Sequence, residues 1–511
     1  MLKTEFIKLI VFLGTLIIFC FGYGKAIQRK SYAASSVELL QLLEVEDKLV
    51  ENLNDYVKKL KRKLNLLDKS LLIMKAEQNQ MRDDYEAYLG NPLNSFRLIH
   101  RLHSDWSKWH HYASKINKDE LGHIEKANQM RKRLPTAHDL EQSCRGIDGL
   151  ISFYGLRPED LAAGNLAGYP NPETALSAQD CFALGEFSLR NRKEDRAEIW
   201  FNLTLAQFSK DNLLYKVNRF SRFTVHNTWA ALLVKNQALS DDYQFEKLPK
   251  ESEKNQLYQW INEEILTKRN CRAIFRQQSR LHCRYNSSTT PFTRIAPLKM
   301  EELSSDPYMV IYHDVIYDRE INWLLDTAKL SLSLVDAGTM SEFRASKDAN
   351  IILSQGKVVR TLDERVTDMT GLSMELSDEF SLINYGLGGH YVLHTDYHNY
   401  YNQVRYIDTG KLITHFVKPL QTRWARGDRL ATLLFYLGDV DSGGATIFPM
   451  INVSVTPKRG SAVFWHNLHN SGDMNIKATH SGCPVIVGSK YVLTKWINEL
   501  PQVFLTPCMK R

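Results

Sequence analysis

The chain has 511 residues, of which 43% are hydrophobic and 24% are charged, a composition typical of folded globular proteins rather than disordered ones. Its 65 basic and 58 acidic residues leave a net charge of +7, which is small for this length. Because no arginine-rich or aromatic-interleaved motif accompanies that charge, the composition argues against a nucleic-acid-binding protein.

Residues 1–26 are predicted to form a secretory signal peptide. Lys3 and Lys8 give it a basic start, residues 9–21 are apolar, and small residues follow up to Ala26. The apolar run is shorter than the roughly 20 residues of a membrane-spanning helix, although an uncleaved membrane anchor is the alternative. We therefore expect the chain to enter the secretory pathway and to have no membrane span after cleavage.

That compartment permits disulfides and N-linked glycans. Removal of the signal leaves six cysteines, an even number whose pairing the sequence alone does not determine: Cys144, Cys181, Cys271, Cys283, Cys483 and Cys508. Three sequons predict glycosylation, at Asn202, Asn286 and Asn452.

Residues 36–80 are predicted to be helical. Their apolar residues recur mostly at steps of three or four, the spacing of a coiled coil. This pattern favours self-association, and a helical hairpin within one chain is the alternative. Gly90-Asn91-Pro92 interrupts the helix, and a second apolar-periodic segment follows. Residues 27–140 are therefore expected to form a helical dimerisation domain.

Residues 145–245 are predicted to form a peptide-binding domain. Two short helical patterns between Ser177 and Phe208 indicate a helix–turn–helix of tetratricopeptide type, and residues 216–238 resemble a second, degenerate copy. Such folds present a concave groove to an extended peptide, whereas a plain helical spacer is the alternative. The polar residues 246–300 are expected to be a linker, in which Cys271 and Cys283 could close a small loop.

From Pro307 onward the pattern changes to short strands separated by glycine- and proline-containing turns, so residues 301–511 are predicted to form a β-sandwich or jelly roll. The fold class is thus α+β multidomain. Two helical patterns are expected near residues 320–330 and 364–376. Strands are expected at residues 310–312, 357–360, 381–385, 430–437, 445–448, 461–465, 484–487 and 491–495.

His394-Thr395-Asp396, together with the distal His480, supplies two imidazoles and one carboxylate. This is the ligand set of a non-haem Fe(II) oxygenase, which leaves metal positions open for O2 and a bidentate cosubstrate. The His-x-Asp spacing fits the end of a strand, where residues i and i+2 point the same way. Lys490 provides a compact cation for a carboxylate in an apolar barrel. The other histidines of the region are not assigned to the metal: His390, His398, His415, His466 and His469.

These motifs resemble the collagen prolyl 4-hydroxylase alpha subunits. The C-terminal blocks that carry the resemblance occur in order: Tyr385…His394-Thr395-Asp396, Gly427-Asp428-Arg429, residues 443–449, residues 460–465, residues 480–485 and Gly488-Ser489-Lys490…Lys495-Trp496. Upstream, residues 86–106 resemble the N-terminal domain of the family. Gly164-Asn165-Leu166 and Asp180-Cys181-Phe182 resemble its peptide-substrate domain.

The resemblance implies a double-stranded β-helix that uses Fe(II), 2-oxoglutarate, O2 and L-ascorbate to hydroxylate prolines in collagen-like X-Pro-Gly sequences. It implies residence in the endoplasmic reticulum lumen and assembly with protein disulfide isomerase, two of each chain. His394, Asp396 and His480 would bind the iron, and Lys490, Tyr385 and Thr446 would bind 2-oxoglutarate. The resemblance places two further residues, Arg429 and Trp496, near the peptide substrate. It also suggests the disulfides Cys271–Cys283 and Cys483–Cys508.

Three departures from the family pattern bear on function. Asn498 occupies the position of a family histidine, which predicts weaker use of 2-oxoglutarate because an amide cannot become cationic. Glu194-Asp195 replaces a tyrosine pair, which predicts poor binding of proline-rich peptides and favours basic ones. The loop from Tyr397 to Arg426 is longer than in the family, at the position of a substrate lid. Two alternatives remain open at this stage: a catalytically weak binding subunit, and a hydroxylase of another residue such as lysine.

Overall fold

The computed structural model describes residues 36–59, 70–76, 78–79, 84–113, 121–209, 212–243, 265–272, 281–328, 330–332, 346–397, 426–503 and 505. The predicted signal peptide, about half of the expected linker, Cys508 and the interior of the Tyr397–Arg426 loop lie outside these residues. No helix of the described part is both long enough and apolar enough to cross a membrane.

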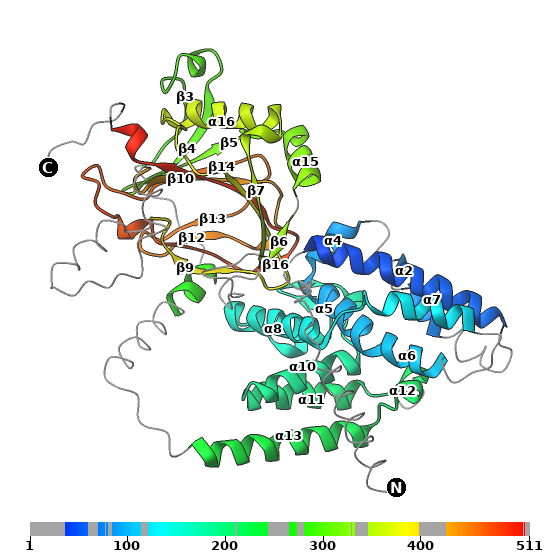
Figure 1. The fold of residues 1–511 in the computed structure, drawn as a ribbon. Coiled ribbons are helices and arrows are strands. Elements are labelled where there is room, and N and C mark those ends of the chain that lie inside the picture. The colour runs from blue at the N-terminus through cyan, green and yellow to red at the C-terminus, as the bar shows by residue number, and fades with distance from the viewer. Residues whose placement is uncertain are drawn as a thin grey trace, which may run out of the picture. The chain divides into compact units, whose positions relative to one another are not determined.

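Helices predominate up to residue 272 (Figure 1). Their bounds are α2 Ser36–Lys59, α4 Tyr85–Gly90, α5 Pro92–His100, a π-helix Arg101–Asp105, α6 Trp106–Ala113, α7 Leu121–Arg131, α8 Ala137–Tyr154, α9 Pro158–Ala162, α10 Ala178–Arg190, α11 Glu194–Gln207, α12 Leu213–Asn218, α13 Arg222–Tyr243 and a helix at 265–272. A two-stranded hairpin, β1 (Asn165–Leu166) and β2 (Tyr169–Pro170), interrupts them.

The apolar face of α2 is buried inside its own chain. Leu39, Leu42 and Leu49 pack in one cluster with Leu71 and with residues of α4, α5 and α6. The predicted break is confirmed, because α4 ends at Gly90 and the Asn91 side chain accepts a hydrogen bond from Leu93 N at 2.9 Å. The described part of this stretch is therefore covered by intrachain helices, and its self-association stays a prediction.

The predicted helix–turn–helix corresponds to α10 and α11. A Cβ at Gly185 of α10 would lie 3.1 Å from the Phe201 ring of α11, so the glycine permits the close approach of the two helices. Glu194 and Asp195 form the first turn of α11, where acidic side chains complement the positive end of the helix dipole. These two residues therefore have a structural role in starting the helix.

The C-terminal half contains two main antiparallel sheets, consistent with a jelly roll (Figure 1). The nine-stranded sheet has the order β3-β4-β5-β14-β10-β17-β8-β7-β6, and the four-stranded sheet has the order β13-β12-β15-β9. The strands of the larger sheet are β3 Cys283–Asn286, β4 Leu298–Ser305, β5 Tyr308–His313, β6 Ser331–Leu332, β7 Ser346–Ile351, β8 Phe380–Tyr385, β10 Arg429–Tyr436, β14 Ala462–His466 and β17 Tyr491–Asn498. Those of the smaller sheet are β9 Tyr391–His394, β12 Thr446–Phe448, β13 Val453–Val455 and β15 His480–Gly482, and β11 Ser442–Gly443 pairs with β16 Val485–Val487.

The larger sheet has a hydrophobic cluster on each face. One face packs on α15 (Asp318–Thr327) and α16 (Lys357–Thr370) through residues such as Leu362, Leu433 and Leu493. The other face contributes Ile383 and Tyr436, which pack with Phe448 of the smaller sheet. The second cluster forms the interior of the jelly roll.

Two expectations for this region were wrong. Residues 357–360 are not a strand but the first turn of α16, since Val359, Leu362 and Val366 all face the core at helical spacing. The range 246–300 is not linker throughout, because β3 forms the edge of the nine-stranded sheet through its pairing with β4. The sheet therefore begins before residue 301.

Two helices approach the strands of the C-terminal half through glycines. A Cβ at Gly146 of α8 would lie 2.6 Å from Leu387 O, and one at Gly90 of α4 would lie 2.5 Å from Gly488 Cα. Gly488 N also donates a hydrogen bond to Gly90 O at 2.7 Å. Since these segments precede β9 and Lys490, the helices help to fix the position of the site described next.

Candidate active site

The three predicted metal ligands come together at one end of the smaller sheet. His394 is the last residue of β9 and His480 the first of β15, and the two residues face each other in the antiparallel pairing of these strands. Asp396 follows two residues after His394, and one ligand atom from each side chain lies within 4.8 Å of the others. Within the described residues this is the one such cluster of His, Cys, Asp and Glu side chains.

The hydrogen bonds of the two histidines orient their rings. Nδ1 of His394 donates to Val392 O at 2.8 Å, and Nδ1 of His480 donates to Ala478 O at 3.0 Å. The lone pairs therefore reside on the Nε2 atoms, each of which lies 3.7 Å from an oxygen of Asp396.

The carboxyl of Asp396 is held ionised. Its burial favours the neutral acid, but the positive charges of His480 and His394 in their protonated forms, and of Arg429, outweigh this effect and lower its pKa below the ordinary value. A carboxylate and two neutral imidazoles at this separation fit Fe(II).

Two polar side chains suited to an anionic cosubstrate lie near the triad. A Cβ at Gly482, two residues after His480, would lie 3.5 Å from Tyr385 Oη and 3.7 Å from Lys490 Nζ. The Tyr385 hydroxyl and the Lys490 ammonium therefore both lie next to this glycine. Lys490 is only 2% exposed, and its Nζ lies 5.1 Å from the centroid of the Tyr385 ring. Burial lowers the pKa of Lys490 to about 7. Such a cation is stabilised by a bound carboxylate, which suits 2-oxoglutarate.

Thr446, the remaining predicted 2-oxoglutarate residue, is buried in β12 and accepts a hydrogen bond from Tyr436 Oη at 2.9 Å. Sequence reasoning missed Tyr436 and also Thr432, which lies four residues earlier on β10. The available signal was alternation: residues 432, 434 and 436 share one face of the strand, and two of them are polar within an apolar run.

The two residues expected near the peptide lie together beside the triad. The guanidinium of Arg429 lies 3.9 Å from the Trp496 ring centroid, and Arg429 also forms an ion pair with Asp378 at 2.8 Å. Arg429 Nη1 donates to Asp396 O at 3.4 Å. This position next to Asp396, a predicted metal ligand, is compatible with a role in holding the peptide.

Asn498 lies on β17 opposite Arg429 and is 4% exposed. Its Nδ2 donates a hydrogen bond to Leu376 O at 2.7 Å. The amide thus binds the chain segment before β8. Of the histidines not assigned to iron, His390 packs on Phe153 with ring centroids 4.9 Å apart, whereas His398 and His415 lie outside the described residues.

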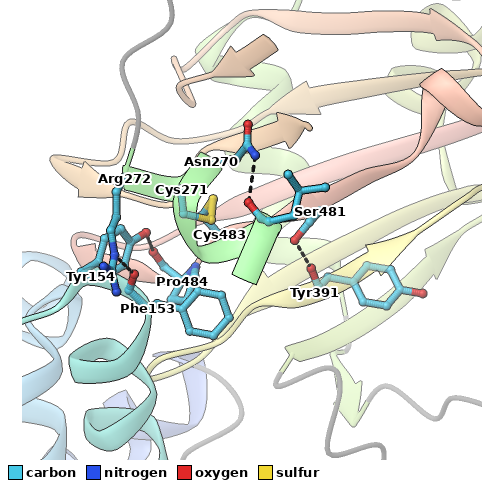
Figure 2. Close-up of a disulfide and its surroundings, with 10 residues drawn as sticks. Phe153, Tyr154, Asn270, Cys271, Arg272, Tyr391, Ser481, Cys483 and Pro484 are labelled. Atoms are coloured by element: carbon cyan, nitrogen blue, oxygen red, sulfur yellow. Dashed lines mark hydrogen bonds between the residues drawn. A yellow bond between two sulfur atoms is a disulfide. The ribbon is translucent and has the colours of Figure 1, made fainter. Parts of the chain in front are cut away.

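A disulfide connects the helix at 265–272 to the segment after His480 (Figure 2). Cys271 pairs with Cys483, which is 212 residues away in sequence and three residues beyond the predicted metal ligand His480. The neighbouring Arg272 donates hydrogen bonds to the carbonyl oxygens at the end of α8, and Tyr154 Oη donates to Pro484 O at 2.5 Å. These contacts hold the helix against the end of β15.

This pairing corrects both predicted disulfides. Because a cysteine forms one disulfide, the Cys271–Cys483 bond excludes Cys271–Cys283 and Cys483–Cys508 in this structure. The prediction paired each cysteine with a near neighbour in sequence, whereas the helix at 265–272 returns to a distant strand. The described cysteines outside a disulfide are the buried Cys144 and Cys181 and the exposed Cys283.

Comparison with known proteins agrees with this geometry. Residues 35–168 match the family model of the prolyl 4-hydroxylase alpha-subunit N-terminal region, and residues 380–498 match the 2OG-Fe(II) oxygenase superfamily. Prolyl 4-hydroxylase subunit alpha-1 of Gallus gallus is 30% identical over 511 residues, covering 91% of this chain and 95% of the relative. The chain belongs to the prolyl 4-hydroxylase alpha-subunit family. Subunit alpha-1 of Rattus norvegicus is 29% identical over 520 residues, covering 92% of this chain and 94% of the relative.

Among solved structures, a viral collagen prolyl hydroxylase from Paramecium Bursaria Chlorella virus-1 in complex with 2OG is 19% identical, with a TM-score of 0.29. The match covers 38% of this chain and 97% of the viral chain. As a member of the prolyl 4-hydroxylase family, the chain is a 2-oxoglutarate-dependent oxygenase with Fe(II) as its metal. In it, His394, Asp396 and His480 form the donor set that fits the iron.

Proposed function

We propose that the chain 4-hydroxylates prolyl residues in collagen-like X-Pro-Gly sequences of secreted proteins, with O2 and decarboxylation of 2-oxoglutarate. The observation that carries this proposal is that the buried Lys490 lies close to Gly482, two residues after His480 of the predicted iron triad. Three protein ligands would leave metal positions for the cosubstrate and O2, and the Lys490 ammonium would pair with the other carboxylate of the cosubstrate.

The residues of the chain bind and orient the substrates and exclude water from the site. Fe(II), when bound with 2-oxoglutarate and O2, supplies the oxidising chemistry. Lys490 and Tyr385 would hold the distal carboxylate of the cosubstrate, and the hydrogen-bonded side chains of Tyr436 on β10 and Thr446 on β12 would lie next to it. Trp465 and Phe448 pack against His480 with ring centroids 4.9 and 5.4 Å from it, which keeps water from that side of the site. Arg429 and Trp496 position the peptide at the open side.

The proposal is tested with a collagen-like peptide of Pro-Pro-Gly triplets and a matched peptide that carries lysine at the acceptor position. Mass spectrometry should find hydroxyproline in the first peptide with the wild-type chain and none with His394→Ala. Hydroxylysine in the second peptide would instead support the lysine-hydroxylase alternative. Absence of any product, with Fe(II) and 2-oxoglutarate present, would support the catalytically weak binding subunit.

Residues 145–245 are proposed to bind peptides, as a tetratricopeptide-like domain. A cavity of about 530 Å³ lies beside the start of α11, and no aromatic residue is present in its lining: Ile151, Leu156, Pro158, Arg192, Lys193, Glu194, Asp195, Arg196 and Ile199. Since proline-rich helices bind by packing on aromatic rings, we expect weak polyproline binding here. Titration of the full chain with a polyproline peptide tests this, and tight, saturable binding lost in Ile199→Lys would contradict it.

We further propose that the chain works in the endoplasmic reticulum lumen, with ascorbate as a cofactor, in a tetramer of two such chains and two protein disulfide isomerase chains. The alpha-subunit relatives and the predicted signal peptide support this. Among the three predicted glycosylation sites, Asn202 and Asn452 are exposed and Asn286 is half-buried. A pull-down of the tagged chain from lumenal extract should recover the isomerase, and recovery of the chain alone would contradict the assembly.

A further inference from the structure

One oxygen of the iron ligand Asp396 is already engaged by the protein. Asp396 Oδ2 accepts a hydrogen bond from Thr432 Oγ1 at 2.7 Å, and Thr432 Oγ1 accepts one from Asn467 Nδ2 at 2.9 Å. Asp396 is 6% exposed, while Thr432 and Asn467 are fully buried. A chain of two hydrogen bonds therefore runs from the interior of the jelly roll to the metal site.

The chemistry of the three groups fixes the direction of both hydrogen bonds. An ionised carboxylate only accepts, so the single proton of the Thr432 hydroxyl points to Asp396. The hydroxyl oxygen must then accept, which requires the NH2 group of Asn467 on its other side. Asn467 Oδ1 consequently lacks a hydrogen-bond partner among the described residues, although it is buried. The fold thus tolerates one unsatisfied oxygen, which usually costs about 1–3 kcal/mol.

Backbone contacts fix Asn467 in this place. Its N donates to Leu430 O at 2.8 Å, and its O accepts from Asn475 N at 3.0 Å. Leu430 belongs to β10, the strand that also carries Thr432. The amide and the hydroxyl are therefore held by the same strand, and neither can withdraw from Asp396 without distorting it.

We propose that Thr432 and Asn467 are positioning residues that make Asp396 a monodentate iron ligand through Oδ1. Each Asp396 oxygen lies 3.7 Å from one imidazole Nε2, Oδ1 from that of His394 and Oδ2 from that of His480, so these distances favour neither oxygen. The hydrogen bond from Thr432 distinguishes them, because it occupies Oδ2 and reduces its electron density, which makes Oδ1 the preferred donor. A carboxylate that bound through both oxygens would occupy the metal position needed for O2. This inference rests on the proposed Fe(II) and 2-oxoglutarate site, and it assigns roles to two residues outside the ligand set.

The first test compares Thr432→Val, which removes the hydroxyl at nearly constant shape, with Thr432→Ser, which keeps it. Thr293→Val is the matched control, because Thr293 is also fully buried and its hydroxyl donates to Thr290 O and accepts from Thr290 N. Fe(II) and Co(II) affinities are measured without oxygen or peptide, with the visible charge-transfer band of the Fe(II)–2-oxoglutarate complex as the spectroscopic readout.

We expect Thr432→Val to bind metal about 10–100-fold more weakly and to shift the charge-transfer band. It should also decarboxylate 2-oxoglutarate with less peptide hydroxylation per turnover. Thr432→Ser and Thr293→Val should match the wild type. Wild-type metal affinity and an unshifted band in Thr432→Val would overturn the proposal.

A second variant addresses the direction of the hydrogen bonds. Asn467→Asp places an acceptor opposite Thr432 and competes for the proton that now points to Asp396. We expect it to weaken Co(II) binding at least as much as Thr432→Val, with folding checked by circular dichroism without metal. Wild-type Co(II) affinity in folded Asn467→Asp would refute the role of Asn467. Because the metal affinities and the charge-transfer band are measured without peptide, a wild-type chain that fails to hydroxylate proline would refute the proposed function and leave these two readouts intact.

Discussion

Replacement of Lys490 by methionine should stabilise the chain without ligand and abolish its response to 2-oxoglutarate. Lys490 is fully enclosed, and burial lowers its pKa from 10.5 to about 7. Methionine has a similar length and volume but no charge, so the substitution removes the desolvation cost with little loss of packing.

The magnitude follows from the pKa of Lys490. Below pH 7 the amine is protonated in both the folded and unfolded chains, and the full cost of burying the cation is present. The difference between 10.5 and about 7, at about 1.4 kcal/mol per pH unit, corresponds to roughly 5 kcal/mol. As the pH rises from 7 towards 10.5, the folded chain holds a neutral amine and the cost declines. The stability advantage of Lys490→Met should therefore be largest below pH 7 and smaller at pH 9.

Thermal unfolding between about pH 6 and pH 9, with and without 2-oxoglutarate, measures both effects. The ligand should raise the melting temperature of the wild type, because its carboxylate neutralises the buried ammonium, and should not affect Lys490→Met. Lys477→Met is the control, since Lys477 is half-exposed in an ion pair with Asp306 and contributes little to stability. Parallel pH profiles of the wild type and Lys490→Met, or a retained ligand effect in the variant, would refute the reasoning.

Three further predictions concern the disulfide, the helix contact and Asn498. Cys271→Ser should lower stability by up to roughly 5 kcal/mol because it opens a long loop, and Cys283→Ser should not; equal losses would favour the Cys271–Cys283 pairing instead. Gly146→Ala should cost about 1–3 kcal/mol by overpacking against Leu387, whereas Gly149→Ala, with open space around it, should be neutral or stabilising; equal melting temperatures would contradict the close contact. Asn498→His should increase 2-oxoglutarate decarboxylation by the purified chain if the missing imidazole limits cosubstrate use; no gain would show that the amide serves only its bond to Leu376.

The metal site was predictable from sequence because its signal is local and chemical. His394 and Asp396 lie two residues apart at the end of a strand, and a distal histidine with a following lysine completes the set. The alternating pattern of β10 also indicated a buried strand. Thr432 was missed because the alternation that puts its side chain on the same face as Tyr436 does not reveal that its hydroxyl donates to Asp396.

The errors arose where distant contacts outweigh local pattern. Residues 357–360 are β-branched and basic, yet the core contacts of Val359 and Leu362 select a helix. Cys271 met Cys483 across 212 residues, a pairing that no spacing rule detects. The apolar seam of α2 fitted both a dimer and an intrachain bundle; in the described chain it packs on Leu71 and the later helices, and self-association stays a prediction.

The most direct test of the central claim is the origin of the oxygen in hydroxyproline. The wild-type chain, supplied with Fe(II), 2-oxoglutarate and a Pro-Pro-Gly peptide under isotopically labelled O2, should yield hydroxyproline with labelled oxygen and one succinate per hydroxyl group. His394→Ala should yield neither product. Hydroxyproline formed undiminished by His394→Ala, or its absence from a wild-type chain that binds both Fe(II) and 2-oxoglutarate, would contradict the account.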